Sequence, residues 1–87
     1  MSKNRNWCFT LNNPTLDETN KIRHLCEDDE SIKYVIVGHE FGLEGTPHLQ
    51  GYIEFKNPRT FNSVKDTLIR CHIESRKGTQ EQAINHC

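Results

Sequence analysis

Residues 32–55 read I-K-Y-V-I-V-G-H-E-F-G-L-E-G-T-P-H-L-Q-G-Y-I-E-F, and this stretch decides the fold. Its first part, up to Glu40, is rich in β-branched residues, and its last part, from His48, alternates apolar with polar positions, so both parts predict strands. Glycines and a proline interrupt the segment between them, residues 41–47, which favours an antiparallel hairpin. Because both faces of the first strand are largely apolar, we expect that strand to lie in the centre of a sheet.

The chain before this hairpin predicts a strand and then a helix. Residues 7–12 alternate with a period of two, and the Asn13-Pro14 pair ends the strand. Thr15 and Glu18 have the spacing of a capping box, and an apolar stripe at helical spacing follows until the acidic run that begins at Glu27.

The chain after the hairpin predicts a helix and then a strand. Phe61, Val64 and Leu68 are spaced as on the buried face of a helix, and residues 71–75 alternate as in a short fourth strand. A second capping box at residues 79–82 predicts a last helix running toward the end of the sequence. The fold class is therefore α+β: an antiparallel sheet with flanking helices in the split βαβ order of ferredoxin-like domains.

Composition limits the classes of protein that remain. A chain of 87 residues, with 33% hydrophobic and 26% charged residues, is expected to form one small globular domain. It has no apolar run of about 20 residues and no signal peptide at its start, so we expect an intracellular protein without a membrane partner. The four cysteines form no C-x-x-C pair, so neither a zinc knuckle nor a disulfide scaffold is indicated, although a zinc-stabilised interaction domain remains a rival.

Charge is uneven along the chain. The net charge is -1, yet residues 56–77 contain six Lys and Arg against two acidic residues. A surface that is polarised in this way can face phosphates on one side, although a mixed solvated surface is an equally good interpretation of charge alone. The basic candidates for backbone contacts with a nucleic acid are Lys56, Arg59, Lys65, Arg70, Arg76 and Lys77. Candidate aromatic surfaces for stacking on bases are Trp7, Phe9 and Tyr52, each of which can instead belong to the core, Phe9 above all.

A candidate metal site lies in the hairpin. His48 and Gln50 are two residues apart on a strand, so their side chains share one face. Closure of the hairpin brings Glu40 alongside His48, which joins a carboxylate, an imidazole and an amide oxygen. This ligand set suits Mg²⁺ or Mn²⁺, although spacing alone favours solvent-facing strand residues over a metal site.

Three motifs, in this order, resemble those of the Rep replication initiators of circoviruses and related viruses with single-stranded circular DNA. They are W-C-F-T-L-N-N at residues 7–13, T-P-H-L-Q-G at 46–51, and residues 77–87. The V-G-x-E at 37–40, the R-C-H-I-E at 70–74 and the K-G-T at 77–79 are also similar to circovirus Rep. The resemblance covers nearly the whole chain and implies an endonuclease of the HUH class, with Gln50 in place of the second histidine.

This resemblance implies a function. Thr10, Asn12 and Asn13 belong to a motif associated with recognition of the origin DNA, and Glu40, His48 and Gln50 match the ligands of a divalent metal, Mn²⁺ or Mg²⁺. The enzyme would nick and rejoin single-stranded DNA at a stem-loop origin of rolling-circle replication, as a nucleotidyltransferase acting in the host nucleus. Residues 1–87 would form its single origin-binding and nicking domain, followed in the full protein by a helicase domain and by regions for Rep self-association.

The nucleophile departs from the family pattern. In the family a helix-borne tyrosine attacks phosphorus, which leaves a 5′-phosphotyrosine and a free 3′-hydroxyl, and His86 occupies that slot here. Three interpretations are open: a replacement, natural or engineered, that stops cleavage; His86 as a nucleophile through a phosphoramidate; or His86 as a further metal ligand. We favour the first, a chain that binds DNA but is deficient in cleavage. The alternative function is a non-catalytic module that binds single-stranded nucleic acid.

Overall fold

The computed structural model describes residues 3–41 and 45–76. The elements in chain order are β1 (Asn4–Asn12), α1 (Leu16–Arg23), α2 (Leu25–Asp28), β2 (Ile32–Phe41), β3 (Pro47–Arg59), α3 (Phe61–Thr67) and β4 (His72–Ser75). The predicted helix of residues 79–87 lies outside the described residues. None of the helices in the described ranges is long and apolar enough to cross a membrane.

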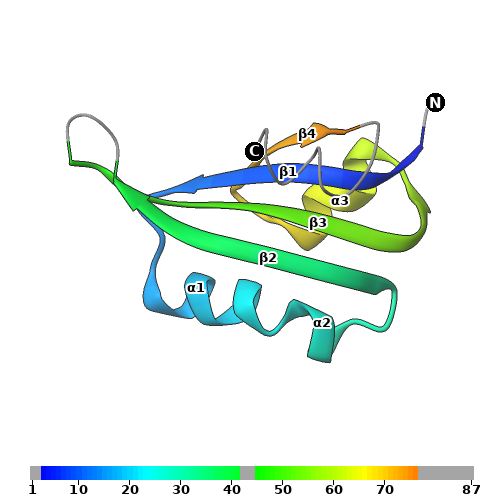
Figure 1. Ribbon diagram of the computed structural model, residues 1–87, viewed down its shortest axis with the longest axis horizontal. Helices are drawn as coiled ribbons and strands as arrows, with labels where there is room; N and C mark the ends of the chain where they lie inside the picture. Colours follow the sequence, from blue (N-terminus) through cyan, green and yellow to red (C-terminus); the bar gives the residue numbers. More distant parts are fainter. Residues whose placement is uncertain (1–2, 42–44, 77–87) are drawn as a thin grey trace.

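The strands form one sheet in the order β2-β3-β1-β4, in which every neighbouring pair is antiparallel. β1 and β2 therefore run in the same direction with β3 between them, as Figure 1 shows. This is the split βαβ arrangement, so the predicted α+β class with an antiparallel sheet is confirmed.

The core lies between one face of this sheet and the helices. Odd-numbered residues of β1 and β3 point to that face, and Phe9, Leu49 and Ile53 are at most 1% exposed. Ile22 of α1 and Val64 of α3 belong to the same buried cluster. The period-two pattern of the sequence therefore predicted the buried face of these strands correctly.

The expected central strand is an edge strand. β2 pairs only with β3 among the described strands, and Ile36 on its outer face is 42% exposed. The register shifts between Ile32 and Tyr34, which places Ile32 opposite Phe55 in the core rather than on the face of Tyr34 and Ile36. An extra residue in one strand of a pair reverses the alternation in this way.

Three other expectations need correction. The first helix ends at Arg23, and a short helix, α2, follows after His24, whose ring Nδ1 lies 2.8 Å from the Asn20 carbonyl oxygen. Phe61, predicted on the buried face of the second helix, is 51% exposed and makes an edge contact with the Trp7 ring. β3 also continues past its expected end to Arg59.

Candidate metal centre and nucleic-acid interface

The face of the sheet away from the helices carries the candidate site. Two rows of neighbouring residues cross this face, as the strand register shows. The first row is Glu40, His48 and Asn12, and the second is Gly38, Gln50, Thr10 and His72. The metal and DNA candidates, which the sequence places in three separate segments, therefore lie side by side.

Glu40 and His48 are directly opposite each other in the ladder between β2 and β3. The Nε2 atom of His48 lies 3.3 Å from the Oε2 atom of Glu40. Two ligands at about 2.1 Å from one octahedral ion, at right angles to each other, are about 3 Å apart, so this pair fits adjacent positions around Mg²⁺ or Mn²⁺. Closure of the hairpin thus produces the predicted pairing of carboxylate and imidazole.

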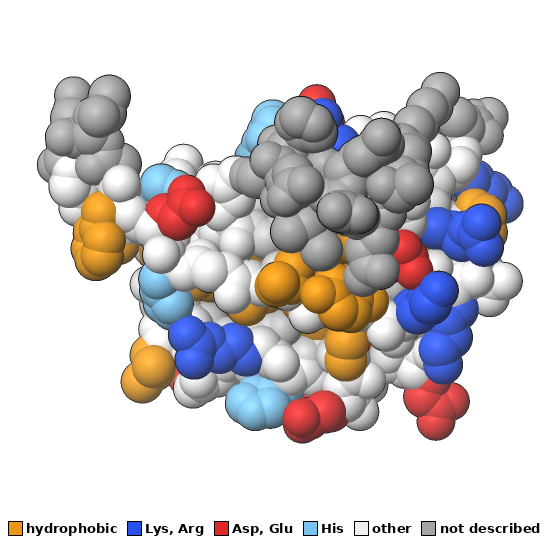
Figure 2. All heavy atoms as spheres, in the orientation of Figure 1, with side chains coloured by type: hydrophobic (Ala, Val, Ile, Leu, Met, Phe, Trp, Pro, Cys, Tyr) orange, Lys and Arg blue, Asp and Glu red, His pale blue; other side chains and the backbone are white. Residues whose placement is uncertain are grey.

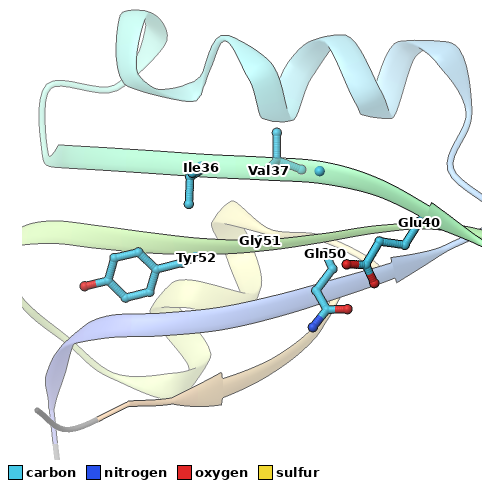
Figure 3. Close-up of a pocket in the computed structure, with 7 residues that line it drawn as sticks. Ile36, Val37, Glu40, Gln50, Gly51 and Tyr52 are labelled. Carbon is cyan, nitrogen blue, oxygen red and sulfur yellow. The ribbon is translucent and has the colours of Figure 1, made fainter. Parts of the chain in front are cut away.

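Gln50 follows His48 by two residues and extends from the same side of the sheet as Glu40 (Figure 3). Its amide and the Glu40 carboxylate border a hollow of about 260 Å³, whose apolar side is Ile36. Gly38 also lines the hollow, and a Cβ atom placed at that residue would have no atom within 4 Å. The hollow offers space for part of a ligand beside the candidate metal ligands.

Within residues 3–41 and 45–76, no three side chains of the His, Cys, Asp and Glu types gather in a way that could hold a metal. The candidate site contains two side chains of those types, and its third is the amide of Gln50. A hard cation that accepts amide oxygen fits this donor set better than zinc does, since structural zinc sites use sulfur and nitrogen ligands.

The predicted basic contacts differ in their surroundings. Arg59 is half-buried: its guanidinium donates to Ser63, to Ser31 at 3.2 Å and to Thr67 at 3.3 Å. Its Cζ also lies 4.5 Å from the centre of the Phe55 ring. Arg59 therefore holds β3 to α3, and its assignment as a phosphate contact gains no support from this position.

The other predicted cations range from bonded to exposed. Lys65 donates to the carbonyl of Cys71, and Arg76 lies 3.8 Å from the Glu74 carboxylate. Lys56 is exposed and lines a polar pocket with Arg5 and with Lys33, whose ammonium lies 3.1 Å from the Glu54 carboxylate. The charge count along the sequence did not single out Arg5 or Lys33. Figure 2 shows several basic side chains at one end of the molecule, with acidic side chains among them, and a further basic group toward the other end. Lys77 and His86 lie outside the described residues.

The aromatic candidates belong to the interior. Trp7 is 3% exposed and Phe9 is 1% exposed, both on the helix-covered face. Tyr52 lies on the opposite face but is also fully buried, and its hydroxyl donates to Glu54 at 3.0 Å. Burial and this hydrogen bond raise the pKa of Tyr52 well above its usual range. None of the three presents a free ring for stacking on a base.

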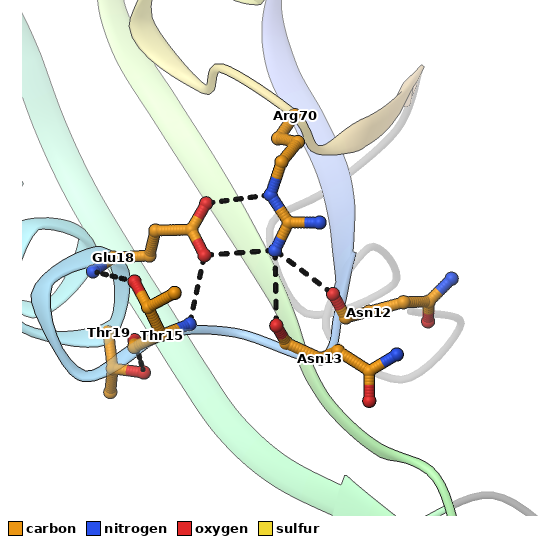
Figure 4. A network of polar contacts seen from close by, with 6 residues as sticks. All are labelled: Asn12, Asn13, Thr15, Glu18, Thr19 and Arg70. Carbon is orange, nitrogen blue, oxygen red and sulfur yellow. Dashed lines mark hydrogen bonds and ion pairs between the residues drawn. The ribbon is translucent and has the colours of Figure 1, made fainter.

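A polar network at the end of β1 was not foreseen (Figure 4). The predicted capping box is confirmed, since the Thr15 N–H donates to Glu18 Oε1 and the Glu18 N–H donates to Thr15 Oγ1. Arg70 also binds the Glu18 carboxylate, with Nε 2.8 Å from Oε2 and Nη2 2.9 Å from Oε1. The Arg70 guanidinium, helped by the Thr15 bonds, lowers the pKa of Glu18 to about 2.

Comparison with known proteins identifies the family. Residues 4–87 match the sequence family described as "Putative viral replication protein". The chain is 51% identical over 86 residues to the replication-associated protein of porcine circovirus 2, in an alignment that covers 95% of this chain and 26% of that protein. The replication-associated protein of beak and feather disease virus is 47% identical over 83 residues, which cover 95% of this chain and 28% of that protein.

The similarity extends to plant viruses. The master replication protein of banana bunchy top virus is 37% identical over 81 residues, which cover 93% of this chain and 26% of that protein. The chain thus spans about a quarter of the length of these relatives. The resemblance found in the sequence motifs is confirmed: the chain belongs to the viral replication proteins, with a circovirus-like Rep sequence.

Proposed function

We propose that this chain binds single-stranded DNA at a stem-loop origin, and that its fold is built for metal-dependent nicking and joining of that strand. The observation that carries the proposal is the 3.3 Å approach of His48 Nε2 to Glu40 Oε2, with Gln50 on the same face. Thr10 and Asn12, the candidates for base recognition, occupy the neighbouring positions of β1.

Glu40, His48 and Gln50 are the side chains that would hold Mn²⁺ or Mg²⁺. A bound cation would offset the negative charge that develops on the scissile phosphate. Glu40 remains 56% exposed and His48 18% exposed, so a phosphate can approach this pair from the open side of the sheet.

The neighbouring side chains would position the strand. Thr10 lies directly beside Gln50, and Asn12 lies directly beside His48, so a phosphate near the metal ligands brings the adjacent nucleotide within reach of β1. A hydroxyl and an amide can each donate and accept hydrogen bonds, which suits recognition of base edges. Lys56 and Arg5 offer phosphate contacts at the far end of the same strands, where Lys33 is already paired with the Glu54 carboxylate at 3.1 Å.

The nucleophile limits the reaction. Because His86 stands in the sequence slot of the family's tyrosine, we propose that this chain retains binding and metal coordination but is deficient in cleavage. An imidazole places its reacting atom differently from a phenol oxygen, and an error of about 1 Å can cost about a hundredfold in rate.

The test is incubation with an end-labelled stem-loop DNA and Mn²⁺, read on a denaturing gel for both shortened DNA and protein-linked DNA. The expected result is metal-assisted binding with little adduct, and His86→Tyr in a chain extended past Cys87 should produce the adduct. If that variant neither binds the DNA nor forms the adduct, the proposal is overturned. Tight binding that is the same with and without Mn²⁺, together with no adduct from His86→Tyr, would instead support the non-catalytic binding module.

A further inference from the structure

Arg70 stands at the turn between α3 and β4 and reaches the end of β1. Besides its two contacts with Glu18, its Nη2 donates to the carbonyl oxygens of Asn12 and Asn13, each at 3.1 Å. The Asn13 N–H is also bound, to the carbonyl oxygen of Pro47 at 2.9 Å. The backbone of Asn13 is therefore held from both sides, by Arg70 and by the residue that precedes His48.

Two backbone conformations in this network are unusual. Arg70 has a φ of 72° and Asn13 a φ of 51°, both in the left-handed region. Asparagine enters this region readily, but arginine does so rarely. Such conformations persist where surrounding contacts determine them, and they concentrate at functional positions. The bonds from Arg70 to Glu18 and to both asparagine carbonyls are the contacts that can determine them here.

We propose that the Glu18–Arg70 pair is a positioning device that presents Asn12 and Asn13 to single-stranded DNA, so that Arg70 acts through these asparagines rather than as a phosphate contact. The proposal rests on the proposed function, because it needs Asn12 and Asn13 to contact DNA. It assigns Glu18 and Arg70 the role of setting the specificity of the β1 end.

The geometry favours this role over a direct phosphate contact. Glu18 meets the guanidinium edge-on through both carboxylate oxygens, a bidentate arrangement that fixes the plane of the Arg70 head group. A carboxylate at 2.8 Å also opposes the approach of a phosphate to the same arginine. The planar guanidinium can bind the carboxylate and two successive carbonyls at once, which a lysine ammonium cannot reproduce.

The two roles predict opposite effects for Glu18→Gln. Glutamine still completes a capping box, so α1 keeps its start, but the charged pair with Arg70 is lost. If Arg70 positions the asparagines, this variant binds DNA more weakly. If Arg70 contacts phosphate, removal of a nearby negative charge leaves binding equal or stronger. Asp17→Asn is the matched control, because it removes the same charge from the same helical turn outside the network.

The probe is the tightest-binding oligonucleotide that the unmodified chain selects from a randomised single-stranded DNA pool, with a scrambled oligonucleotide beside it. We expect Glu18→Gln and Arg70→Lys each to reduce the preference for the selected over the scrambled sequence by at least about fivefold, the loss of roughly one base contact. The salt dependence of binding should stay unchanged for Arg70→Lys, because the charge is kept. Asp17→Asn should keep the preference.

A non-additivity test separates positioning from a general loss of structure. In a chain that already carries Asn12→Ala and Asn13→Ala, Arg70→Lys should reduce the preference no further, since the residues it positions are gone. Unfolding curves of each variant report the fraction folded at the assay temperature. The proposal is overturned if folded Glu18→Gln and Arg70→Lys chains keep the full preference for the selected oligonucleotide. It is also overturned if Arg70→Lys reduces this preference as much in the chain with Asn12→Ala and Asn13→Ala as in the unmodified chain. If the unmodified chain selects no sequence at all, the proposed function itself fails.

Discussion

Gly51 of β3 lies directly opposite Phe9 of β1, and the Phe9 ring lies over the place where a side chain at residue 51 would stand. A Cβ atom built there would collide with the Phe9 ring, whose Cε1 would be 2.9 Å away, and with the carbonyl oxygen of Ile36. Phe9 is 1% exposed, so the ring has no free space into which to move. The glycine after the H-L-Q motif is therefore required by packing.

Gly51→Ala is expected to lower the free energy of unfolding by about 1–3 kcal/mol, the usual cost of adding a methyl group to a filled core. Gly38→Ala is the matched control, a strand glycine whose side-chain position is open, and it should change stability by less than about 0.5 kcal/mol. Urea unfolding of both variants measures the two values. If both variants lowered the free energy of unfolding equally, the close packing of the Phe9 ring over Gly51 would not be the reason that residue 51 is a glycine.

Arg59 and Lys56 come from the same basic segment but should behave differently. Arg59→Ala removes the hydrogen bonds to Ser31, Ser63 and Thr67 and the contact with the Phe55 ring, so we expect a loss of about 2 kcal/mol in unfolding free energy. Lys56→Ala, at an exposed side chain, should change stability by less than about 0.5 kcal/mol. Chemical denaturation compares the two variants, and a stable Arg59→Ala would contradict the structural role of the arginine.

Lys56 can be tested further through salt. If it contacts a phosphate, Lys56→Ala should weaken binding of all single-stranded DNA sequences alike and reduce the slope of log affinity against log salt by roughly 1. Affinity measured over a series of salt concentrations gives this slope. An unchanged slope would remove Lys56 from the interface.

The local patterns of the sequence were enough to predict most of the elements. Period-two alternation placed β1 and β3, capping residues located the start of α1, and the glycines and proline marked the hairpin that joins Glu40 to His48. These signals act over a few residues, and the hairpin constrains its own register. For that reason the candidate metal pair could be foreseen.

Features that depend on contacts between distant segments could not be foreseen. An apolar strand such as β2 can lie at the centre or at the edge of a sheet, and only the pairing of the whole sheet decides this. The Glu18–Arg70 pair joins residues 52 positions apart, and no local spacing signals it. Likewise, a basic residue such as Arg59 has the same sequence signature whether its partners are phosphates or the hydroxyls of Ser31 and Ser63.

The candidate metal site gives a prediction that needs no DNA. His48→Ala and Gln50→Ala should each weaken Mn²⁺ binding by at least about tenfold while sparing the fold, because both side chains lie on the open face of the sheet. His39→Ala is the matched control: His39 is exposed but lies opposite Leu49, on the other face from His48. Calorimetric titration with MnCl₂ measures the affinities. Equal affinity in the His48 and His39 variants would place the metal elsewhere.

Glu18 predicts how stability depends on pH. Its pKa falls from an ordinary value of 4.5 to about 2 in the folded chain, chiefly because Arg70 and Thr15 donate hydrogen bonds to the carboxylate. A group with a lowered folded-state pKa stabilises the fold fully above its unfolded-state value, and this stabilisation is lost as the pH falls through the folded-state value. The contribution of Glu18 should therefore be complete above pH 4.5 and disappear between pH 4.5 and about 2.

Glu18→Gln removes this titration, so the difference in unfolding free energy between the unmodified chain and the variant should shrink as the pH is lowered across that interval. Asp29, whose pKa is also lowered by hydrogen bonds from Ser31, is present in both chains and cancels in the difference. Asp17→Asn, outside the network, should not reproduce the effect. Denaturant unfolding at a series of pH values supplies the measurement, and a difference that stays constant down to pH 2 would show that the Arg70 contact does not hold Glu18 ionised.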